Sequence, residues 1–195
     1  MGKSATGKDT IYKKLLQNSE LGLKRIVSYT TRPIREGEKE GEEYHFTDVK
    51  NLELLKEQGK VIECRGYDTI HGIWYYFMAK DSQIDLEKND YLVIGTLESY
   101  LNIRKYFGNE NVIPIYIDLE DGERLSRALK REKAQRFPKY EELCRRFLAD
   151  CQDFTAEKLQ EAGIEHAFEN SDLEQCVIQI EQYILSMKFY TTETT

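Results

Sequence analysis

An α/β fold with a parallel sheet flanked by helices is the architecture that the sequence predicts. The first observation is the segment Gly2–Lys8, which fits the pattern G-x-x-x-x-G-K. The second is the alternation of strand-like and helix-like patterns after residue 78. The third is the β-branched, nearly continuous apolar run Val112–Ile117, which is typical of a strand buried on both faces. Such alternation favours parallel strands joined by helices.

The composition indicates a globular protein without a broad affinity for polyanions. The 195 residues are 40% hydrophobic and 32% charged, and the formal net charge is −7. Phosphate binding therefore has to come from local clusters of cations. We expect one domain with a small appendage, acting as a monomer or homodimer and binding no nucleic acid.

The sequence also carries no signal for membranes or disulfides. No apolar run approaches the ~20 residues that span a bilayer, and no signal peptide opens the sequence. The four cysteines lack the spacing of a zinc site, which indicates reduced thiols. We expect a cytoplasmic protein with no membrane partner.

The glycine-rich segment predicts a phosphate-binding loop. Glycines let successive backbone N–H groups turn towards one anion, the lysine reaches the outer phosphates, and the helix N-terminus favours negative charge. The residues that would bind a nucleoside triphosphate here are Gly2, Lys3, Ser4, Ala5, Thr6, Gly7, Lys8, Asp9 and Thr10.

Asp9 and Thr10 are the candidate metal ligands. The pattern has Ser or Thr directly after its lysine, to hold magnesium, whereas here Asp9 takes that place and Thr10 follows. Asp9 either holds the metal through a water or repels the polyphosphate. Only Met1 precedes Gly2, although a buried strand normally leads into such a loop. We expect a chain truncated upstream, or a start assigned to an internal methionine; a sheet without this strand is the third alternative.

Short strand patterns predominate in residues 28–78, which we expect to form an insert. Asp48 is placed to cap its helix, which Gly59 would close. Up to residue 78 the predicted elements are a helix at Lys8–Gln17, strands at Arg25–Thr30 and Glu43–Phe46, the helix capped by Asp48, and strands at Lys60–Tyr67 and Ile73–Phe77.

Helices and strands alternate beyond residue 78. Ser171 with Glu174 predicts a capping box for the last helix, whose apolar face includes Cys176 and Ile180. The other predicted elements are helices at Ala79–Lys88, Glu98–Phe107 and Tyr140–Leu159, and strands at Tyr91–Ile94, Val112–Ile117 and Glu165–Glu169.

Two clusters of arginines bear on phosphate chemistry. Arg32 and Arg35 flank Pro33 ahead of Tyr44, which indicates a braced anion site, because a guanidinium grips phosphate through two hydrogen bonds. A solvated basic loop is the alternative. Residues 124–146 hold nine Lys or Arg against three Glu. This segment is either a solvated helical face or an arginine-bearing lid over a triphosphate.

The segment from Thr30 to Phe46, T-T-R-P-x-R-x-G-E-x-x-G-x-x-Y-x-F, resembles the signature of the guanylate kinase family. The resemblance covers nearly the whole chain. It implies the P-loop nucleoside monophosphate kinase fold, with a core formed by residues 1–27, 79–121 and 147–195, a GMP-binding insert at 28–78 and a helical lid at 122–146. It also implies ATP-dependent, Mg²⁺-assisted phosphorylation of GMP to GDP, and of dGMP to its diphosphate, in purine nucleotide metabolism.

The resemblance assigns roles to individual residues. It implies that Lys8, Arg127, Arg131 and Arg146 act on the transferring phosphoryl group. Asn170 matches a residue near the adenine of ATP, although turn chemistry is an equal alternative. The residues that match the GMP site are Ser28, Arg32, Arg35, Tyr44, Glu63 and His71. The Glu63 carboxylate suits guanine, since its two oxygens can accept from N1–H and N2–H, a pair that adenine lacks.

The chain departs from the family pattern at two further places. Gly95 and Leu97 stand where the family has an acidic pair, and His71 and Ile73 stand where it has a tyrosine and a Ser or Thr. A kinase for another nucleoside monophosphate and a non-catalytic module that keeps the GMP pocket are therefore the alternatives. The phosphate loop and the lid arginines argue against the module, which has no use for an ATP site.

Overall fold

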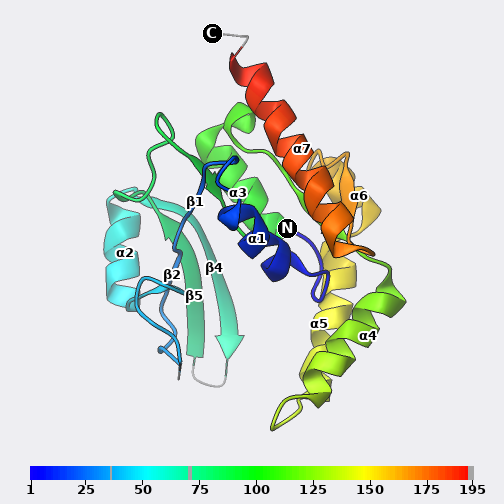
Figure 1. The fold of residues 1–195 in the computed structure, drawn as a ribbon. Helices are drawn as coiled ribbons and strands as arrows, with labels where there is room; N and C mark the ends of the chain where they lie inside the picture. Colours follow the sequence, from blue (N-terminus) through cyan, green and yellow to red (C-terminus); the bar gives the residue numbers. More distant parts are fainter. Residues whose placement is uncertain (36, 70–71, 193–195) are drawn as a thin grey trace. The chain divides into compact units, whose positions relative to one another are not determined.

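The computed structural model describes residues 1–35, 37–69 and 72–192, with side chains as far as residue 187. The chain forms two compact units (Figure 1), which are described separately. The first unit comprises Met1–Leu23, Ile94–Tyr100 and Ile113–Thr195. The second comprises Lys24–Val93 and Leu101–Val112.

A four-stranded sheet in the order β3-β2-β5-β4 dominates the second unit. Strand β2 runs parallel to β3 and antiparallel to β5, and β4 and β5 form an antiparallel hairpin. The bounds are Tyr29–Thr30 for β2, His45–Phe46 for β3, Val61–Thr69 for β4 and Gly72–Ala79 for β5. A separate pair joins β1 (Leu23–Arg25) to β6 (Asp90–Leu92).

Helix α2 (Val49–Glu57) packs on this sheet through Leu52, which is fully buried with Phe77 and Ala79. The Asp48 side chain caps the helix as predicted, accepting a hydrogen bond from the Asn51 N–H over 2.7 Å. The Asp48 cap and the burial of Leu52 together stabilise α2, so the helix does not depend on a high intrinsic helix propensity.

The first unit is built on a parallel strand pair, β7 (Tyr116–Asp118) with β8 (Ala167–Glu169). The backbone of Met1 lies beside β7, since its carbonyl accepts from the N–H of Ile117 over 2.9 Å. The helices of this unit are α1 (Lys8–Gln17), α4 (Asp121–Lys133), α5 (Tyr140–Asp153), α6 (Ala156–Glu161) and α7 (Leu173–Thr192), and α3 (Leu97–Phe107) begins in it. Helix α7 packs on α1 and β8 through the predicted apolar face, with Cys176 and Ile180 buried.

The helix predicted at Ala79–Lys88 is wrong. Strand β5 continues to Ala79, and residues 80–89 form turns. Asp81 accepts hydrogen bonds from the Gln83 N–H over 2.8 Å and from the hydroxyl of Tyr29 over 2.7 Å. Side chains that bond to nearby backbone and to a neighbouring strand stabilise the turn against a helix.

Several other element boundaries differ from the predictions. The helix predicted at Tyr140–Leu159 divides, because Thr155 caps a new helix by accepting from the Lys158 N–H over 3.3 Å. The apolar run Val112–Ile117 contributes only its end to β7. The strand predicted at Arg25–Thr30 is interrupted: Arg25 is the last residue of β1, and Tyr29–Thr30 is the whole of β2. Local side-chain bonding and pairing partners, rather than apolar content, fix these limits.

The cap of α7 also differs from the prediction. Asp172, not Ser171, accepts from the N–H three residues later, that of Gln175, over 2.9 Å. The capping box predicted from Ser171 and Glu174 is therefore displaced by one residue, because an Asp beside a Ser offers an equally good cap.

Within the described residues, no helix is long and apolar enough to cross a membrane.

The displaced cap gives a direct test. We expect Asp172→Ala to lower the free energy of unfolding by about 1 kcal/mol, because the N–H of Gln175 loses its acceptor. The matched control, Ser171→Ala, should change it by less than about 0.5 kcal/mol. Urea denaturation of both variants decides the matter, and an equal loss in the two would contradict the assigned cap.

Candidate functional site

The phosphate loop, Gly2–Lys8, lies in close contact with the strand pair of the first unit. Gly2 has φ of +147°, and a Cβ there would lie 2.2 Å from the carbonyl oxygen of Ile117. Gly7 has φ of +89°, and its Cβ would lie 2.3 Å from Nδ2 of Asn170. Both positions therefore require glycine, for backbone conformation and for space. Helix α1 begins directly after Gly7, which directs its N-terminus at the loop.

Lys8 closes over the loop that precedes it. Its Nζ donates to the carbonyl oxygen of Lys3 over 2.7 Å, and the hydroxyl of the buried Thr6 donates to the same oxygen over 3.0 Å. Burial lowers the pKa of Lys8 below the ordinary lysine value. The ammonium group is thus held beside the anion cradle in a partly desolvated place, where its attraction to phosphate is strengthened.

Ala5 is strained within this loop. It is the one non-glycine residue at positive φ, +63°, in the part of the chain that the structure describes. The left-handed conformation costs an L-residue about 1–2 kcal/mol. Such strain persists only where the surrounding contacts fix the backbone.

Asn170 supports the loop from the end of β8. Its Nδ2 donates to the carbonyl oxygen of Thr6 over 2.7 Å, and its own N–H donates to Asp118 over 2.9 Å. The side chain is buried, and Oδ1 finds no hydrogen-bond partner among the described residues. Asn170 therefore holds the backbone of the phosphate loop, and a contact with adenine stays a prediction.

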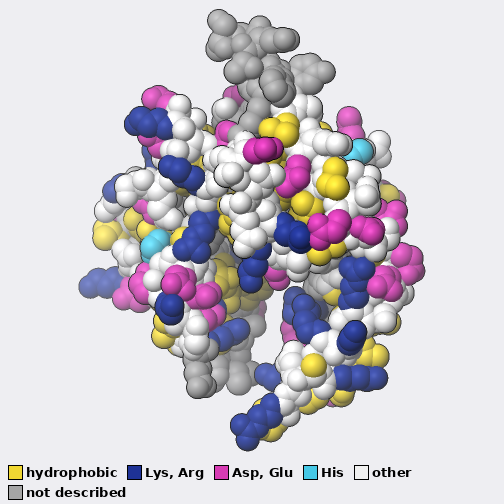
Figure 2. All heavy atoms as spheres, viewed as in Figure 1, with side chains coloured by type: hydrophobic (Ala, Val, Ile, Leu, Met, Phe, Trp, Pro, Cys, Tyr) yellow, Lys and Arg dark blue, Asp and Glu magenta, His cyan; other side chains and the backbone are white. Residues whose placement is uncertain are grey.

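The arginines of α4 and α5 fall into two groups. Arg131 and Arg146 are exposed and Arg127 is half-buried, with its Nε donating to Glu123 over 3.0 Å. Arg146 Nη2 reaches the hydroxyl of Ser4 over 3.3 Å. Figure 2 shows Lys and Arg side chains gathered over the part of the first unit that α4 and α5 form.

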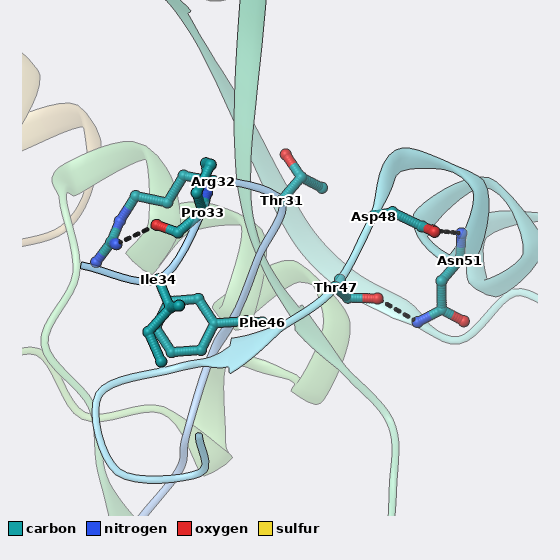
Figure 3. A pocket seen from close by; sticks show the side chains of 8 residues that line it. All are labelled: Thr31, Arg32, Pro33, Ile34, Phe46, Thr47, Asp48 and Asn51. Atoms are coloured by element: carbon teal, nitrogen blue, oxygen red, sulfur yellow. Dashed lines mark hydrogen bonds between the residues drawn. The ribbon is translucent and has the colours of Figure 1, made fainter. Parts of the chain in front are cut away.

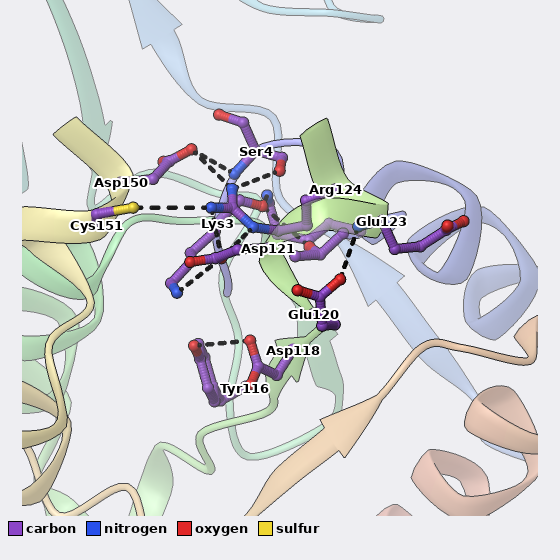
Figure 4. Close-up of polar contacts among 12 residues, drawn as sticks. Lys3, Ser4, Tyr116, Asp118, Glu120, Asp121, Glu123, Arg124, Asp150 and Cys151 are labelled. Atoms are coloured by element: carbon purple, nitrogen blue, oxygen red, sulfur yellow. Dashed lines mark hydrogen bonds and ion pairs between the residues drawn. The ribbon is translucent and has the colours of Figure 1, made fainter. Parts of the chain in front are cut away.

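Arg124, in contrast, is fully buried and contacts Ser4 of the phosphate loop (Figure 4). Sequence reasoning missed this role, because it treated the segment as uniformly basic.

In the second unit, Arg32 forms a preorganised cation. Only 4% of it is exposed, and its Nη1 and Nη2 donate to the two oxygens of Glu38 over 2.7 and 2.6 Å. This ion pair raises the pKa of Arg32 and lowers that of Glu38 to about 2. The Arg32 Cζ also lies 5.1 Å from the ring centre of Tyr44. The guanidinium is thereby held in one orientation by its carboxylate partner.

The other residues predicted for this site surround Arg32 to different degrees. Tyr44 packs edge-on against Tyr76, with ring centres 5.6 Å apart, and burial raises the Tyr44 pKa. Arg35 is exposed, and its N–H donates to Glu38 over 2.9 Å. Ser28 is half-buried, and its carbonyl accepts from the backbone of β3. The predicted His71 lies outside the described residues.

Glu63 is buried and held by a residue that the sequence analysis missed. Arg65 donates from Nε to Oε2 over 3.0 Å and from Nη2 to Oε1 over 3.3 Å. Arg65 stands opposite Tyr76 in the β4–β5 register, so the ion pair and the tyrosine share one face of the sheet. The alternation of side chains along β4 could have revealed Arg65, because it lies two residues from Glu63.

A separate open pocket lies at the start of α2 (Figure 3). Of the predicted site residues only Arg32 lines it. The other lining residues are Thr31, Pro33, Ile34, Phe46, Thr47, Asp48 and Asn51. The pocket therefore neighbours the anion site without containing its tyrosine or carboxylate.

Among the described residues no group of three or more His, Cys, Asp or Glu side chains could hold a metal ion. Asp9 and Thr10 are exposed in the first turn of α1. A carboxylate and a hydroxyl are hard oxygen donors, and Mg²⁺ commonly keeps several waters and binds one or two such groups together with substrate phosphates. The residues therefore fit a magnesium ion that arrives with a nucleotide.

A glycine-rich loop that opens a helix beside a parallel strand pair defines a P-loop nucleotide-binding protein. The family is also established. The family model for guanylate kinase matches residues 1–186, and the chain belongs to that family.

Individual relatives agree with this assignment. Guanylate kinase of Anaplasma phagocytophilum (strain HZ) is 31% identical over 128 residues, which cover 65% of this chain and 59% of the relative. Those of Aromatoleum aromaticum and Neisseria gonorrhoeae are 40% and 43% identical over 72 residues, 37% of this chain and 33% of each relative. The chain thus aligns with less than two thirds of the length of these relatives.

A solved structure shows the same fold. The crystal structure of guanylate kinase from Anaplasma phagocytophilum superposes with a TM-score of 0.58 and 24% identity, covering 95% of this chain and 82% of that one. The predicted α/β kinase fold is confirmed.

The Arg32–Glu38 ion pair predicts a pH dependence of stability. The pKa of Glu38 is lowered from 4.5 to about 2 in the folded chain, so its ionised form stabilises the fold. This contribution is complete above pH 4.5 and disappears as the pH falls through about 2. We expect Glu38→Gln to be less stable than wild type at pH 7, with the difference vanishing near pH 2.

Urea denaturation across this range measures the difference, and the exposed Glu57→Gln serves as control. A loss for Glu38→Gln that persists unchanged at pH 2 would contradict the ion pair as its source.

Proposed function

We propose that the chain catalyses the ATP-dependent phosphorylation of GMP to GDP, and of dGMP to dGDP. The observation that carries the proposal is the presence of two preorganised anion sites in one chain of this family. One is the phosphate loop with Lys8, and the other is Arg32 held by Glu38 beside Tyr44. A donor and an acceptor nucleotide each bring phosphates that such sites suit.

The first unit supplies the donor side of the proposed reaction. The amides of the phosphate loop and Lys8 hold the β- and γ-phosphates of ATP, and Asn170 lies near its base. Arg127, Arg131 and Arg146, all within the lid at residues 122–146, approach the transferring group. Asp9 and Thr10 would hold Mg²⁺, which would neutralise part of the charge on the phosphates.

The second unit supplies the acceptor side, through the insert at residues 28–78. Arg32, Arg35 and Tyr44 bind the GMP phosphate. Ser28 and His71 complete this site, and Glu63, held by Arg65, accepts from the guanine edge. A phosphate oxygen of GMP attacks the γ-phosphorus, and the bond to the β-γ bridging oxygen breaks, leaving ADP. No protein nucleophile is needed, so positioning and cationic stabilisation accelerate the step.

The decisive experiment is a coupled assay with ATP, Mg²⁺ and one of GMP, dGMP, AMP or UMP. We expect turnover with the two guanine nucleotides. Turnover with a different base instead would favour a kinase for another nucleoside monophosphate. Binding of GMP without turnover of any acceptor would favour a non-catalytic module.

Arg32→Ala and Arg35→Ala both test the acceptor site, and the effect of Arg35→Ala is the easier to interpret. We expect Arg32→Ala and Arg35→Ala to raise the KM for GMP roughly ten- to hundredfold, since a charge-assisted contact to phosphate is lost. The KM for ATP should be unchanged. Arg35 is exposed, so its removal leaves the fold intact, whereas removal of Arg32 strands Glu38.

The exposed Arg145→Ala, on α5, is the matched control for steady-state kinetics. Equal effects of Arg35→Ala on the two substrates would argue against the acceptor-site assignment.

The Glu63–Arg65 pair gives a test of base recognition. Glu63→Gln alone strands the Arg65 charge and should cost about 3–5 kcal/mol of stability. The double variant Glu63→Gln/Arg65→Met removes both charges and should recover most of this stability. We expect it to lose most of the preference for GMP over AMP, measured as the ratio of kcat/KM values. A double variant with the wild-type preference would exclude Glu63 from guanine recognition.

A further inference from the structure

Arg124 has a fully buried side chain in the first turn of α4. A guanidinium withdrawn from water is strongly unfavourable unless charges and hydrogen bonds satisfy it. Its Nε and Nη2 donate to Oδ1 of Asp121 over 3.0 and 2.8 Å, and its Nη1 donates to the carbonyl oxygen of Ser4 over 3.1 Å. The ring of Phe147 covers its face, with the ring centre 4.4 Å from Cζ. The buried guanidinium of Arg124 therefore has hydrogen-bond acceptors, a counter-charge and an aromatic ring around it.

Asp150, on α5, completes the arrangement. Its Oδ2 accepts a hydrogen bond from the N–H of Ser4 over 2.7 Å and lies 3.5 Å from Nη1 of Arg124. Figure 4 shows the two side chains converging on Ser4. The peptide groups on both sides of Ser4 are therefore held, the N–H by an anion from α5 and the C=O by a cation from α4. We call Arg124 and Asp150 the Ser4 clamp.

The charges around the clamp balance. Lys3 Nζ lies 3.2 Å from Oδ1 of Asp121, so two cations, Lys3 and Arg124, face two anions, Asp121 and Asp150. Each of the two carboxylates therefore has a cation beside it, which offsets its repulsion of an approaching polyphosphate. The loop keeps its attraction for anions although a carboxylate contacts it.

Stability alone does not account for the clamp. A buried ion pair is often no more stabilising than an apolar pair of the same volume. An apolar pair could fill this space, but it could not hold the N–H and C=O of one residue. The next residue, Ala5, keeps its left-handed conformation at φ of +63°, which requires fixed neighbours.

We propose that Arg124 and Asp150 are positioning residues for nucleotide binding. They hold Ser4 so that the backbone N–H groups of the phosphate loop stay arranged for the phosphates. The identity of the ligand rests on the proposed function, whereas the fixing of the loop does not.

The test compares Arg124→Leu, Asp150→Ala and the double variant with the matched control Arg145→Leu. Isothermal titration with MgADP and, separately, with GMP gives the dissociation constants. We expect the double variant to bind MgADP roughly tenfold or more weakly, with GMP binding unchanged and with the control like wild type. A single variant strands a buried charge, so the double variant, which removes both, decides.

Two outcomes of the titration would overturn the proposal. One is a double variant that binds MgADP as tightly as wild type. The other is tighter binding by Asp150→Ala, because the carboxylate would then be competing with phosphate for the amide of Ser4.

Amide hydrogen exchange of residues 2–8 without nucleotide judges the clamp independently of activity. We expect exchange roughly tenfold faster in the double variant than in Arg145→Leu, because the loop opens more readily. Equal rates would refute the clamp. A wild-type chain that phosphorylates no GMP but shows this difference would overturn the proposed function alone.

Discussion

The first unit depends on the close approach of the phosphate loop to β7 and to the residue that follows β8. Gly2 lies so near the carbonyl of Ile117, and Gly7 so near the amide of Asn170, that neither position has room for a Cβ. The approach lets the ends of β7 and β8 fix the loop through backbone and amide contacts. The loop can therefore bind anions with little ordering on arrival, which is the advantage of preorganisation.

The second unit depends on a different constraint. Its guanidinium groups have to be held in fixed positions within a chain of net charge −7. Its two inward-facing guanidinium groups, those of Arg32 and Arg65, are each paired with a carboxylate through two hydrogen bonds. Each pair holds its guanidinium group in one orientation and leaves neither charge without a counter-charge. The guanidinium of Arg32, to which we assign phosphate binding, is therefore an ordered group.

The sequence predicted what local rules decide. Helix α1 was predicted to the residue, because Gly7 fixes its start and apolar spacing fixes its face. The helix at Ala79–Lys88 failed because its polar side chains bond to the turn and to β2, a tertiary contact that periodicity cannot reveal. Caps were found to within one residue. Strand limits were poorer, since strands end where their partners end.

The candidate site residues were also predicted where a local sequence pattern marked them and missed where it did not. Arg32 and Tyr44 belong to the long specific pattern, and Glu63 follows it; Arg32 and Glu63 are buried and Tyr44 is half-buried. Arg65 could have been predicted from the alternation of side chains along β4, because it lies two residues from Glu63. Arg124 could not have been predicted, because the composition of a basic segment does not distinguish one buried arginine from its exposed neighbours.

The burial of Arg124 also bears on the exposed arginines of α4. Residues seven apart on a helix differ by only about 20° in direction, so Arg124 and Arg131 lie along one stripe, with Arg127 beside it. At its first turn this stripe packs on the phosphate loop; two turns later it is exposed. The contacts of Arg124 with Ser4 and Asp150, together with the burial of Ala128, therefore help to fix the rotation of α4 about its own axis. That rotation decides the direction in which Arg127 and Arg131 point, so the buried cation helps to orient the two that the proposed reaction uses.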